Sequence, residues 1–137
     1  MPAPEPSSSQ NKKRLLVVDD EELVGTLLER FLEDHFAVTV TTDPEVALGE
    51  IAPGSFDLIL TDLRMPKVDG MELLRRARAV APDIPVVIMS GHIAPEDGVS
   101  EITEAGAAGF LRKPFPRKAK LRAYLTGILE SQVSRRP

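Results

Sequence analysis

Four groups of polar side chains each follow a short apolar run of the kind that forms a buried strand. In chain order the groups are Asp19-Asp20, Thr61-Asp62, Ser90-Gly91-His92 and Arg112-Lys113-Pro114. Ligands of parallel sheets bind beyond the carboxyl ends of the strands, so we expect these side chains to share one site. That site would combine three aspartate carboxylates with a serine hydroxyl and a lysine ammonium group.

Three carboxylates in one pocket repel one another and need a positive counter-charge. Two of them about 4 Å apart repel by roughly 4 kcal/mol at an effective dielectric constant near 20. Oxygen ligands alone suit a hard cation that keeps several waters, which describes Mg²⁺. A carboxylate beside bound Mg²⁺ can attack a phosphoryl group and become an aspartyl phosphate. Ser90 and Lys113 would then offer a hydrogen bond and a positive charge to the phosphoryl oxygens.

Each of these residues also has an ordinary structural interpretation. Asp20 precedes two glutamates and could be the N-cap of a helix with an acidic first turn. Asp62 could be a turn residue and Ser90 a loop hydroxyl, while Lys113 could be a solvated charge. Their joint placement after four strands of one sheet favours the functional interpretation.

Apolar runs and amphipathic stretches alternate along the chain, which predicts five strand–helix repeats. The expected strands are residues 15–18, 37–40, 58–60, 85–89 and 109–111, and the expected helices cover 23–32, 44–54, 70–81, 95–105 and 121–129. Such repeats predict an α/β fold, a doubly wound parallel sheet with helices on both faces.

Two of these helices carry recognisable start and stop signals. Asp43 before Pro44 predicts an N-cap and a first helical residue, and Gly54 is the expected end. Asp69, with a glutamate three residues later, resembles a capping box for the helix that Pro82 ends.

Length and composition limit the function classes. The 137 residues suit one domain with a real core, and no apolar run approaches the roughly 18–20 residues of a membrane span. The formal net charge of −4 argues against direct nucleic-acid binding. Without cysteine the chain has neither disulfides nor thiolate metal sites. The start lacks the apolar stretch of a signal peptide, so we expect a cytoplasmic protein.

The domain is expected to occupy residues 14–130. Residues 1–13 are rich in proline, serine and polar groups, which predicts a flexible N-terminal arm. Residues 131–137 are expected to be a C-terminal tail or the remnant of a linker, so the domain either stands alone or belongs to a longer protein.

Four segments, LLVVDDEE, DLILTDLRMPKVDGMELL, VVIMSG and AGFLRKPF, resemble the signature motifs of response-regulator receiver domains. They occur in order with matching spacing, and the resemblance, chemotaxis regulators included, covers about residues 13–130. It implies the flavodoxin-like receiver fold with five parallel strands in the order 2-1-3-4-5. It also implies a switch of two-component signalling that catalyses only its own phosphorylation and autodephosphorylation.

The resemblance assigns a role to each acidic and basic residue of the site. Asp62 is implied to be the phosphoacceptor. Mg²⁺ is implied to bind directly to Asp20, Asp62 and the backbone carbonyl of Arg64, while Asp19 assists through water. Lys113 is implied to pair with a phosphoryl oxygen, and the bond to the proline that follows it is expected to be cis.

The remaining implied residues surround this centre. Ser90 occupies the position that follows the phosphoryl group, and Gly91 is the small neighbour that leaves room for it. Phe110 fills the aromatic switch position. Arg64 and His92 lie two residues after the phosphoacceptor and the switch serine, at positions that tune how fast the phosphoryl group is hydrolysed.

The resemblance also implies partners. The phosphoryl donor would be a histidine kinase or a histidine phosphotransfer protein. A downstream protein would bind the face formed by the fourth helix, the fifth strand and the fifth helix, and a phosphorylation-dependent dimer is a further option. Neither a nucleic-acid nor a membrane partner is expected.

Two other functions compete with the switch. One is a Mg²⁺-dependent phosphohydrolase of the haloacid dehalogenase type, but such enzymes carry Asp-x-Asp after the first strand, whereas Asp19 and Asp20 are adjacent and no cap domain is present. The other is a receiver-like interaction module that is never phosphorylated, against which the intact acidic cluster speaks.

Overall fold

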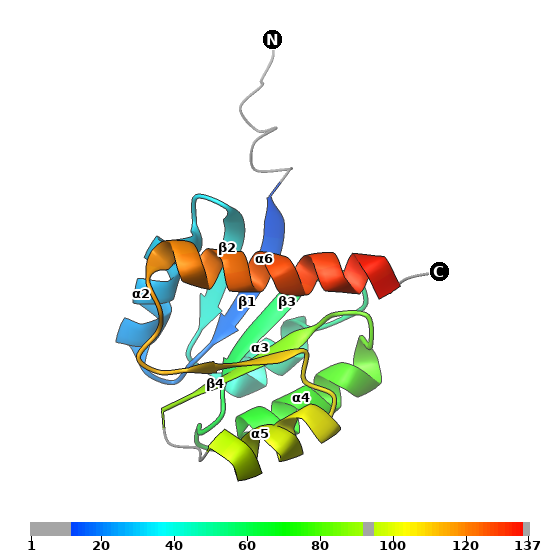
Figure 1. Cartoon of the computed structure of the whole chain (residues 1–137). Helices are drawn as coiled ribbons and strands as arrows, with labels where there is room; N and C mark the ends of the chain where they lie inside the picture. The colour runs from blue at the N-terminus through cyan, green and yellow to red at the C-terminus, as the bar shows by residue number, and fades with distance from the viewer. Residues whose placement is uncertain (1–11, 92–94, 136–137) are drawn as a thin grey trace.

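The computed structural model describes residues 12–91 and 95–135, with backbone only for residues 95–99 and 132–135 (Figure 1). Most of the expected arm and the expected tuning residue His92 lie outside the described residues. Within them five strands alternate with five helices. In chain order these are β1 (Lys13–Val18), α2 (Glu22–Leu32), β2 (Phe36–Thr41), α3 (Pro44–Glu50), β3 (Leu58–Asp62), α4 (Gly70–Val80), β4 (Val86–Ser90), α5 (Pro95–Glu104), β5 (Gly109–Arg112) and α6 (Lys118–Arg135).

All five strands run parallel in one sheet, in the order β2-β1-β3-β4-β5. The predicted doubly wound sheet and its strand order are therefore confirmed. Every residue of β3 and β4 is buried. Near-continuous apolar strands are expected where a parallel sheet is covered on both faces.

Helices cover the sheet in two layers. α2 and α6 lie on one face, and α3, α4 and α5 lie on the other (Figure 1). Successive strand residues point to opposite faces. Leu16 and Val18 therefore pack with α3, α4 and α5, whereas Leu15 and Val17 pack with α2 and α6. The sheet divides the hydrophobic core into two parts.

Some boundaries differ from those expected. The helix expected to end at Gly54 already ends at Glu50, because buried Ile51 takes an extended conformation and Pro53 disfavours a helical residue before it. Gly54 lies in the following turn with φ +80°. β3 and β4 continue through Asp62 and Ser90, beyond the apolar runs, because parallel pairing does not require an apolar side chain.

The last helix overlaps the expected tail. α6 continues past residue 130 to Arg135, and no proline interrupts it. At the other end β1 begins at Lys13, inside the expected arm. Neither α6, with 18 residues, nor any other described helix is both long and apolar enough to cross a membrane.

The chain between β3 and α4 is fixed at both ends. The Asp69 carboxylate accepts a hydrogen bond from the Glu72 backbone N–H at 2.9 Å, which confirms the predicted N-cap. The Glu72 carboxylate instead pairs with arginines of its own helix. Gly70 N–H donates to the Leu63 carbonyl at 2.7 Å, and a Cβ at residue 70 would collide with the Asp62 carbonyl. The start of α4 therefore presses directly against the backbone that follows Asp62.

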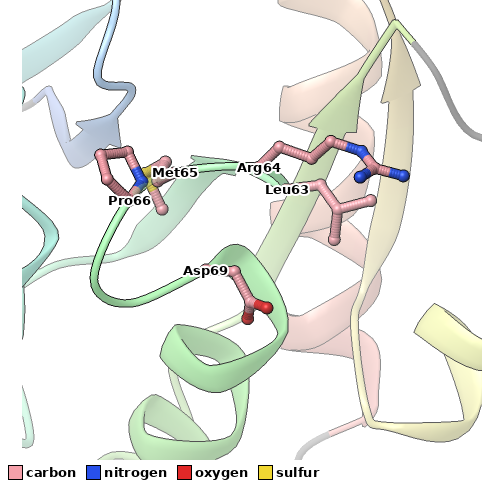
Figure 2. A pocket seen from close by; sticks show the side chains of 5 residues that line it. All are labelled: Leu63, Arg64, Met65, Pro66 and Asp69. Carbon is pink, nitrogen blue, oxygen red and sulfur yellow. The ribbon is translucent and has the colours of Figure 1, made fainter.

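The same loop borders a shallow hollow of about 510 Å³. Figure 2 shows the Arg64 side chain extending away from Met65 and Pro66. Lys67, the next residue, has a φ of +72°, a left-handed conformation that non-glycine residues adopt at a cost. The hollow is lined by Leu63, Arg64, Met65, Pro66 and Asp69.

Candidate functional site

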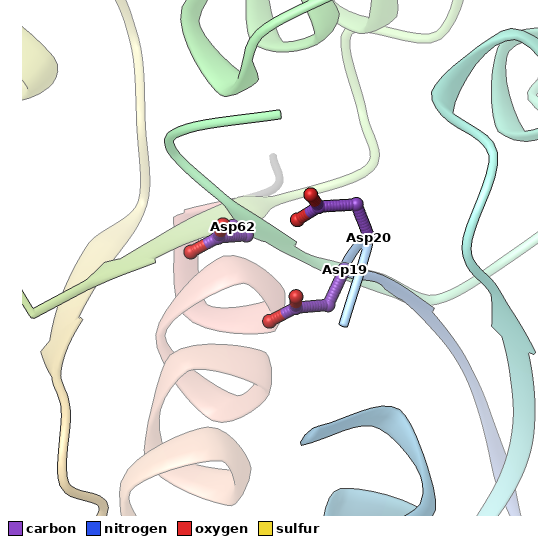
Figure 3. Close-up of side chains that lie close together, drawn as sticks. All are labelled: Asp19, Asp20 and Asp62. Carbon is purple, nitrogen blue, oxygen red and sulfur yellow. The ribbon is translucent and has the colours of Figure 1, made fainter. Parts of the chain in front are cut away.

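Three carboxylates meet at the carboxyl edge of the sheet. Asp19 and Asp20 follow β1, Asp62 is the last residue of β3, and the three side chains lie close together and project to the same side (Figure 3). One oxygen of each lies within 4.8 Å of the others. The register explains the meeting, because Val18 pairs with Thr61 and thus places the next residues of both strands at the same level.

Asp19 is fully buried, and both of its oxygens are engaged. Oδ1 accepts a hydrogen bond from the Glu21 backbone N–H at 2.9 Å, and Oδ2 accepts one from Lys113 Nζ at 3.0 Å. This carboxylate is therefore an anchor inside the site. Residue type and spacing do not distinguish Asp19 from Asp20, and only the family resemblance implied different roles for the two.

Asp20 is exposed and, within the described part of the chain, has no hydrogen bond or ion pair. The interpretation of Asp20 as an N-cap is wrong, because Glu21 holds the N-cap position of α2 and makes no side-chain cap bond there. The carboxylate of Asp20 is thus open to a ligand from solvent, whereas that of Asp19 is not.

Lys113 is the counter-charge of the cluster. Its Nζ lies 3.0 Å from Asp19 Oδ2, 3.1 Å from Asp62 Oδ1 and 4.0 Å from Glu21 Oε1. The side chain is only 20% exposed, so the interpretation of Lys113 as a solvated charge is wrong. Its backbone N–H donates to the Ser90 carbonyl at 3.0 Å, and the peptide bond that follows is cis, as expected.

The surroundings shift the acidity of the two central groups. Burial raises the pKa of Asp62, and although Lys113 lowers it, repulsion from Asp19 and Asp20 leaves it above the ordinary value. Burial lowers the pKa of Lys113, but its hydrogen bonds to Asp19 and Asp62 outweigh that effect and raise it. Lys113 is therefore held charged, and Asp62 is a carboxylate that gains from a further cation.

The other predicted residues lie around this centre. Ser90 is the buried last residue of β4, and Gly91 follows it. A Cβ at Gly91 would lie 3.5 Å from Lys113 Cβ, an ordinary contact. Phe110 is partly buried on β5 and packs against the core part beneath α3, α4 and α5. Arg64 is exposed on the loop after β3.

One contact near the site was not predicted from the sequence. Tyr124 was assigned only to the apolar face of the last helix, yet its hydroxyl binds the backbone of Phe110. The sequence carries no clear signal for this contact, because Tyr124 simply continues the apolar face of the last helix, and its approach to Gly109 is visible only in the structure.

Comparison with known proteins gives a consistent result. Residues 15–126 match the family model described as response regulator receiver domain. The transcriptional regulatory protein FixJ of Bradyrhizobium diazoefficiens is 34% identical over 123 residues, which cover 89% of this chain and 57% of FixJ. The 3',5'-cyclic-nucleotide phosphodiesterase regA of Dictyostelium discoideum is 33% identical over 133 residues, 93% of this chain and 17% of regA. The chain thus spans only part of the length of these relatives.

Solved structures agree. A CheY-like response regulator receiver domain protein from Methanospirillum hungatei superposes with a TM-score of 0.81 at 26% identity, over 90% of this chain and 98% of that one. The chemotaxis protein CheY4 of Vibrio cholerae gives a TM-score of 0.76 at 27% identity, over 85% and 98% of the two chains.

Proposed function

This chain belongs to the response regulator receiver domain family, and on that basis we propose that it is a phosphorylation-dependent signalling switch whose phosphoacceptor is Asp62. One observation carries the proposal. Lys113 Nζ joins Asp62 to the buried Asp19, at 3.1 and 3.0 Å, beside the exposed Asp20. A carboxylate that can act as the nucleophile, a cation and an exposed carboxylate that can bind a metal therefore lie together at one edge of the sheet. Receiver domains are signalling switches and not conventional enzymes.

The donor set fits Mg²⁺. Asp20, Asp62 and the Arg64 backbone carbonyl would bind the ion directly, and Asp19 would assist through water. Asp19 already uses both oxygens within the protein, which supports its indirect role, and the open carboxylate of Asp20 supports a direct one. Carboxylate and carbonyl oxygens are the ligands that Mg²⁺ prefers. The ion would supply positive charge to the oxygens of the transferring phosphoryl group.

In the transfer step an Asp62 oxygen attacks the phosphorus of a phosphohistidine on the donor. The new P–O bond forms while the P–N bond breaks, and the electron pair of the P–N bond stays on the imidazole nitrogen of the donor. Lys113 would move its ammonium group from Asp62 to a phosphoryl oxygen. The Ser90 hydroxyl would bind a second phosphoryl oxygen, and Arg64 and His92 would tune later hydrolysis.

The partners follow from the same proposal. A histidine kinase or a histidine phosphotransfer protein would donate the phosphoryl group. A downstream protein, or a second copy of the chain, would bind the face formed by α5, β5 and α6, the fourth helix, fifth strand and fifth helix of the sequence. The domain would span residues 14–130, between the arm of residues 1–13 and the tail of residues 131–137, with α6 reaching Arg135.

Mass spectrometry after incubation with acetyl phosphate and Mg²⁺ tests this function. We expect one acid-stable, alkali-labile phosphoryl adduct per chain, located on Asp62, that disappears in Asp62→Asn. Asp83→Asn, a substitution of an exposed aspartate, is the matched control and should keep the adduct. Steady turnover of many phosphate esters would instead indicate a hydrolase, and the absence of any reaction would indicate a module that is never phosphorylated.

A further inference from the structure

A single hydroxyl occupies the outer edge of the sheet at β5. The Phe110 backbone N–H donates a hydrogen bond to the Tyr124 hydroxyl at 2.9 Å, and that hydroxyl donates in turn to the Phe110 carbonyl at 3.2 Å. β5 is the last strand in the order, so no strand of the described chain pairs with its outer side. An edge strand leaves such backbone groups unpaired unless another group covers them. Tyr124 thus ties α6 to the backbone of the expected switch residue.

Gly109, next to Phe110 on β5, makes room for this contact. A Cβ at residue 109 would collide with the Tyr124 hydroxyl and would lie 2.8 Å from Ile128 Cδ1. Glycine at this position therefore lets α6 approach β5 closely enough for the phenol to reach the strand. Tyr124 is 37% exposed and also lines a hollow of about 780 Å³ that extends to Arg78 and Thr103. The phenol consequently has space to move into when it leaves the strand.

A series of contacts connects this tyrosine to the proposed phosphorylation site. Asp62 pairs with Lys113, whose backbone N–H binds the end of β4 at Ser90. Phe110 lies on β5, three residues before Lys113, which directly follows this strand, and the Phe110 backbone binds Tyr124. A phosphoryl group on Asp62 would draw both Lys113 and Ser90 toward its oxygens, so β5 is the element that must adjust.

We propose that Tyr124 is a positioning residue whose hydroxyl holds the Phe110 backbone while Asp62 is unphosphorylated and releases it when Asp62 carries a phosphoryl group. This inference rests on the proposed function of Asp62. Two equilibria that share one contact are reciprocally coupled. If the phosphoryl group weakens the bonds between Tyr124 and Phe110, then removal of the hydroxyl strengthens binding at the phosphorylation site by the same factor.

Binding of beryllium fluoride, a phosphoryl mimic, in the presence of Mg²⁺ measures this coupling. We expect Tyr124→Phe to bind the mimic about threefold to tenfold more tightly than the wild type, the factor that corresponds to the net worth of a hydrogen bond. Thr126→Val removes an exposed hydroxyl from the same helix and should leave the affinity unchanged. Unchanged or weaker binding in Tyr124→Phe, with only a lower melting temperature, would show a purely structural contact and overturn the proposal.

A spectroscopic readout separates this inference from the proposed function. The chain has one tyrosine and no tryptophan, so its near-ultraviolet absorbance and fluorescence report on Tyr124 against five phenylalanines. On adding the mimic to wild type we expect the tyrosine signal to change and the Phe110 amide to exchange with solvent faster. A wild type that binds the mimic while both signals stay constant overturns the role of Tyr124 alone. A wild type that does not bind the mimic overturns the proposed function and the inference with it.

Discussion

Lys113 and Asp62 form an ion pair in which Nζ lies 3.1 Å from Oδ1. The same ammonium group holds Asp19, while Asp20 adds a third carboxylate to the cluster. Among the described residues, one positive charge therefore faces the three clustered carboxylates, and Glu21, 4.0 Å from Lys113 Nζ, adds a further negative charge nearby. The site is positioned by the fold at an electrostatic cost, and stability measurements should detect that cost.

Asp62→Asn should stabilise the metal-free protein. The amide keeps the shape of the side chain but removes one charge, so we expect the free energy of unfolding in EDTA at pH 7 to rise by roughly 1 kcal/mol, a few degrees in Tm. The pKa of Asp62 is raised in the folded state, so the favourable contribution of this group exists in acid. That contribution is lost as pH rises from the unfolded value of 3.8 through the raised folded value.

Thermal unfolding of wild type and Asp62→Asn between pH 3 and pH 7 checks this, with Asp83→Asn as the control. The advantage of Asp62→Asn should shrink as pH approaches the acid end. A variant that melts several degrees below wild type at pH 7 would mean that attraction to Lys113 outweighs the repulsion.

Mg²⁺ should stabilise the wild type through this site. At a hundred times its dissociation constant the ion adds about 2.7 kcal/mol to the free energy of unfolding. Asp20→Asn should lose most of that gain while its metal-free stability stays within about 0.5 kcal/mol of wild type, because the Asp20 side chain is exposed. Calorimetry in EDTA and in millimolar Mg²⁺ at constant ionic strength measures both the metal-free stability and the gain from Mg²⁺.

Glu22→Gln is the matched control for this prediction. It removes another exposed charge two residues away, on the first turn of α2 and outside the cluster. Equal Mg²⁺ gains in Asp20→Asn and Glu22→Gln would exclude Asp20 as a metal ligand.

At the opposite end of the sheet, Asp57→Asn should destabilise the protein. The Asp57 carboxylate accepts hydrogen bonds from the Arg14 backbone N–H at 2.8 Å and from Arg14 Nε at 3.3 Å. Burial raises the pKa of Asp57, but these bonds outweigh burial and lower it. We expect a loss of about 1 kcal/mol at pH 7, the usual value of a partly exposed pair.

The pH dependence of this second pair has the opposite sign. A lowered pKa gives a contribution that is present above the unfolded value of 3.8 and is lost as pH falls through the folded value. Urea unfolding of wild type and Asp57→Asn should therefore converge in strong acid. A constant difference over the whole range would assign the effect to packing and not to the charge of Asp57.

Lys67→Gly should stabilise the loop after β3. Lys67 has a φ of +72°, where a side chain costs about 1–2 kcal/mol and glycine costs nothing. Glycine also makes the unfolded chain more flexible, which reduces this stabilisation by roughly 0.5–1 kcal/mol. We expect a net gain of up to about 1 kcal/mol in chemical denaturation. Lys67→Ala keeps the unfavourable φ and should show no gain; an equal gain in both variants would mean that lysine charge and not backbone conformation matters.

The sequence was sufficient for the features that depend on local pattern. Apolar runs predict the strands, and polar residues at their ends predict that Asp19, Asp20 and Asp62 meet. The predicted ends of β3 and β4 were too early, because both strands continue to the polar residues Asp62 and Ser90. A polar side chain marks the start of the site at the sheet edge, but it does not stop backbone pairing.

Contacts between distant side chains left no such pattern. Asp19 and Lys113 are 94 residues apart, and nothing local distinguishes the buried Asp19 from the exposed Asp20. Tyr124 reaches the Phe110 backbone across 14 residues and a change from strand to helix. These contacts depend on how α6 and β5 pack, which is a property of the assembled fold.

The sheet also has a consequence for how this chain can change over time. Among the described residues, no core side chain belongs to both parts of the hydrophobic core. A cavity made at Leu16 cannot be filled by repacking around Leu125, so the energetic costs of changes at the two positions should add. Mutations in one helical layer can therefore accumulate without depending on mutations in the other layer. Changes at the polar edge depend on both layers, because the strands that carry its residues contact both.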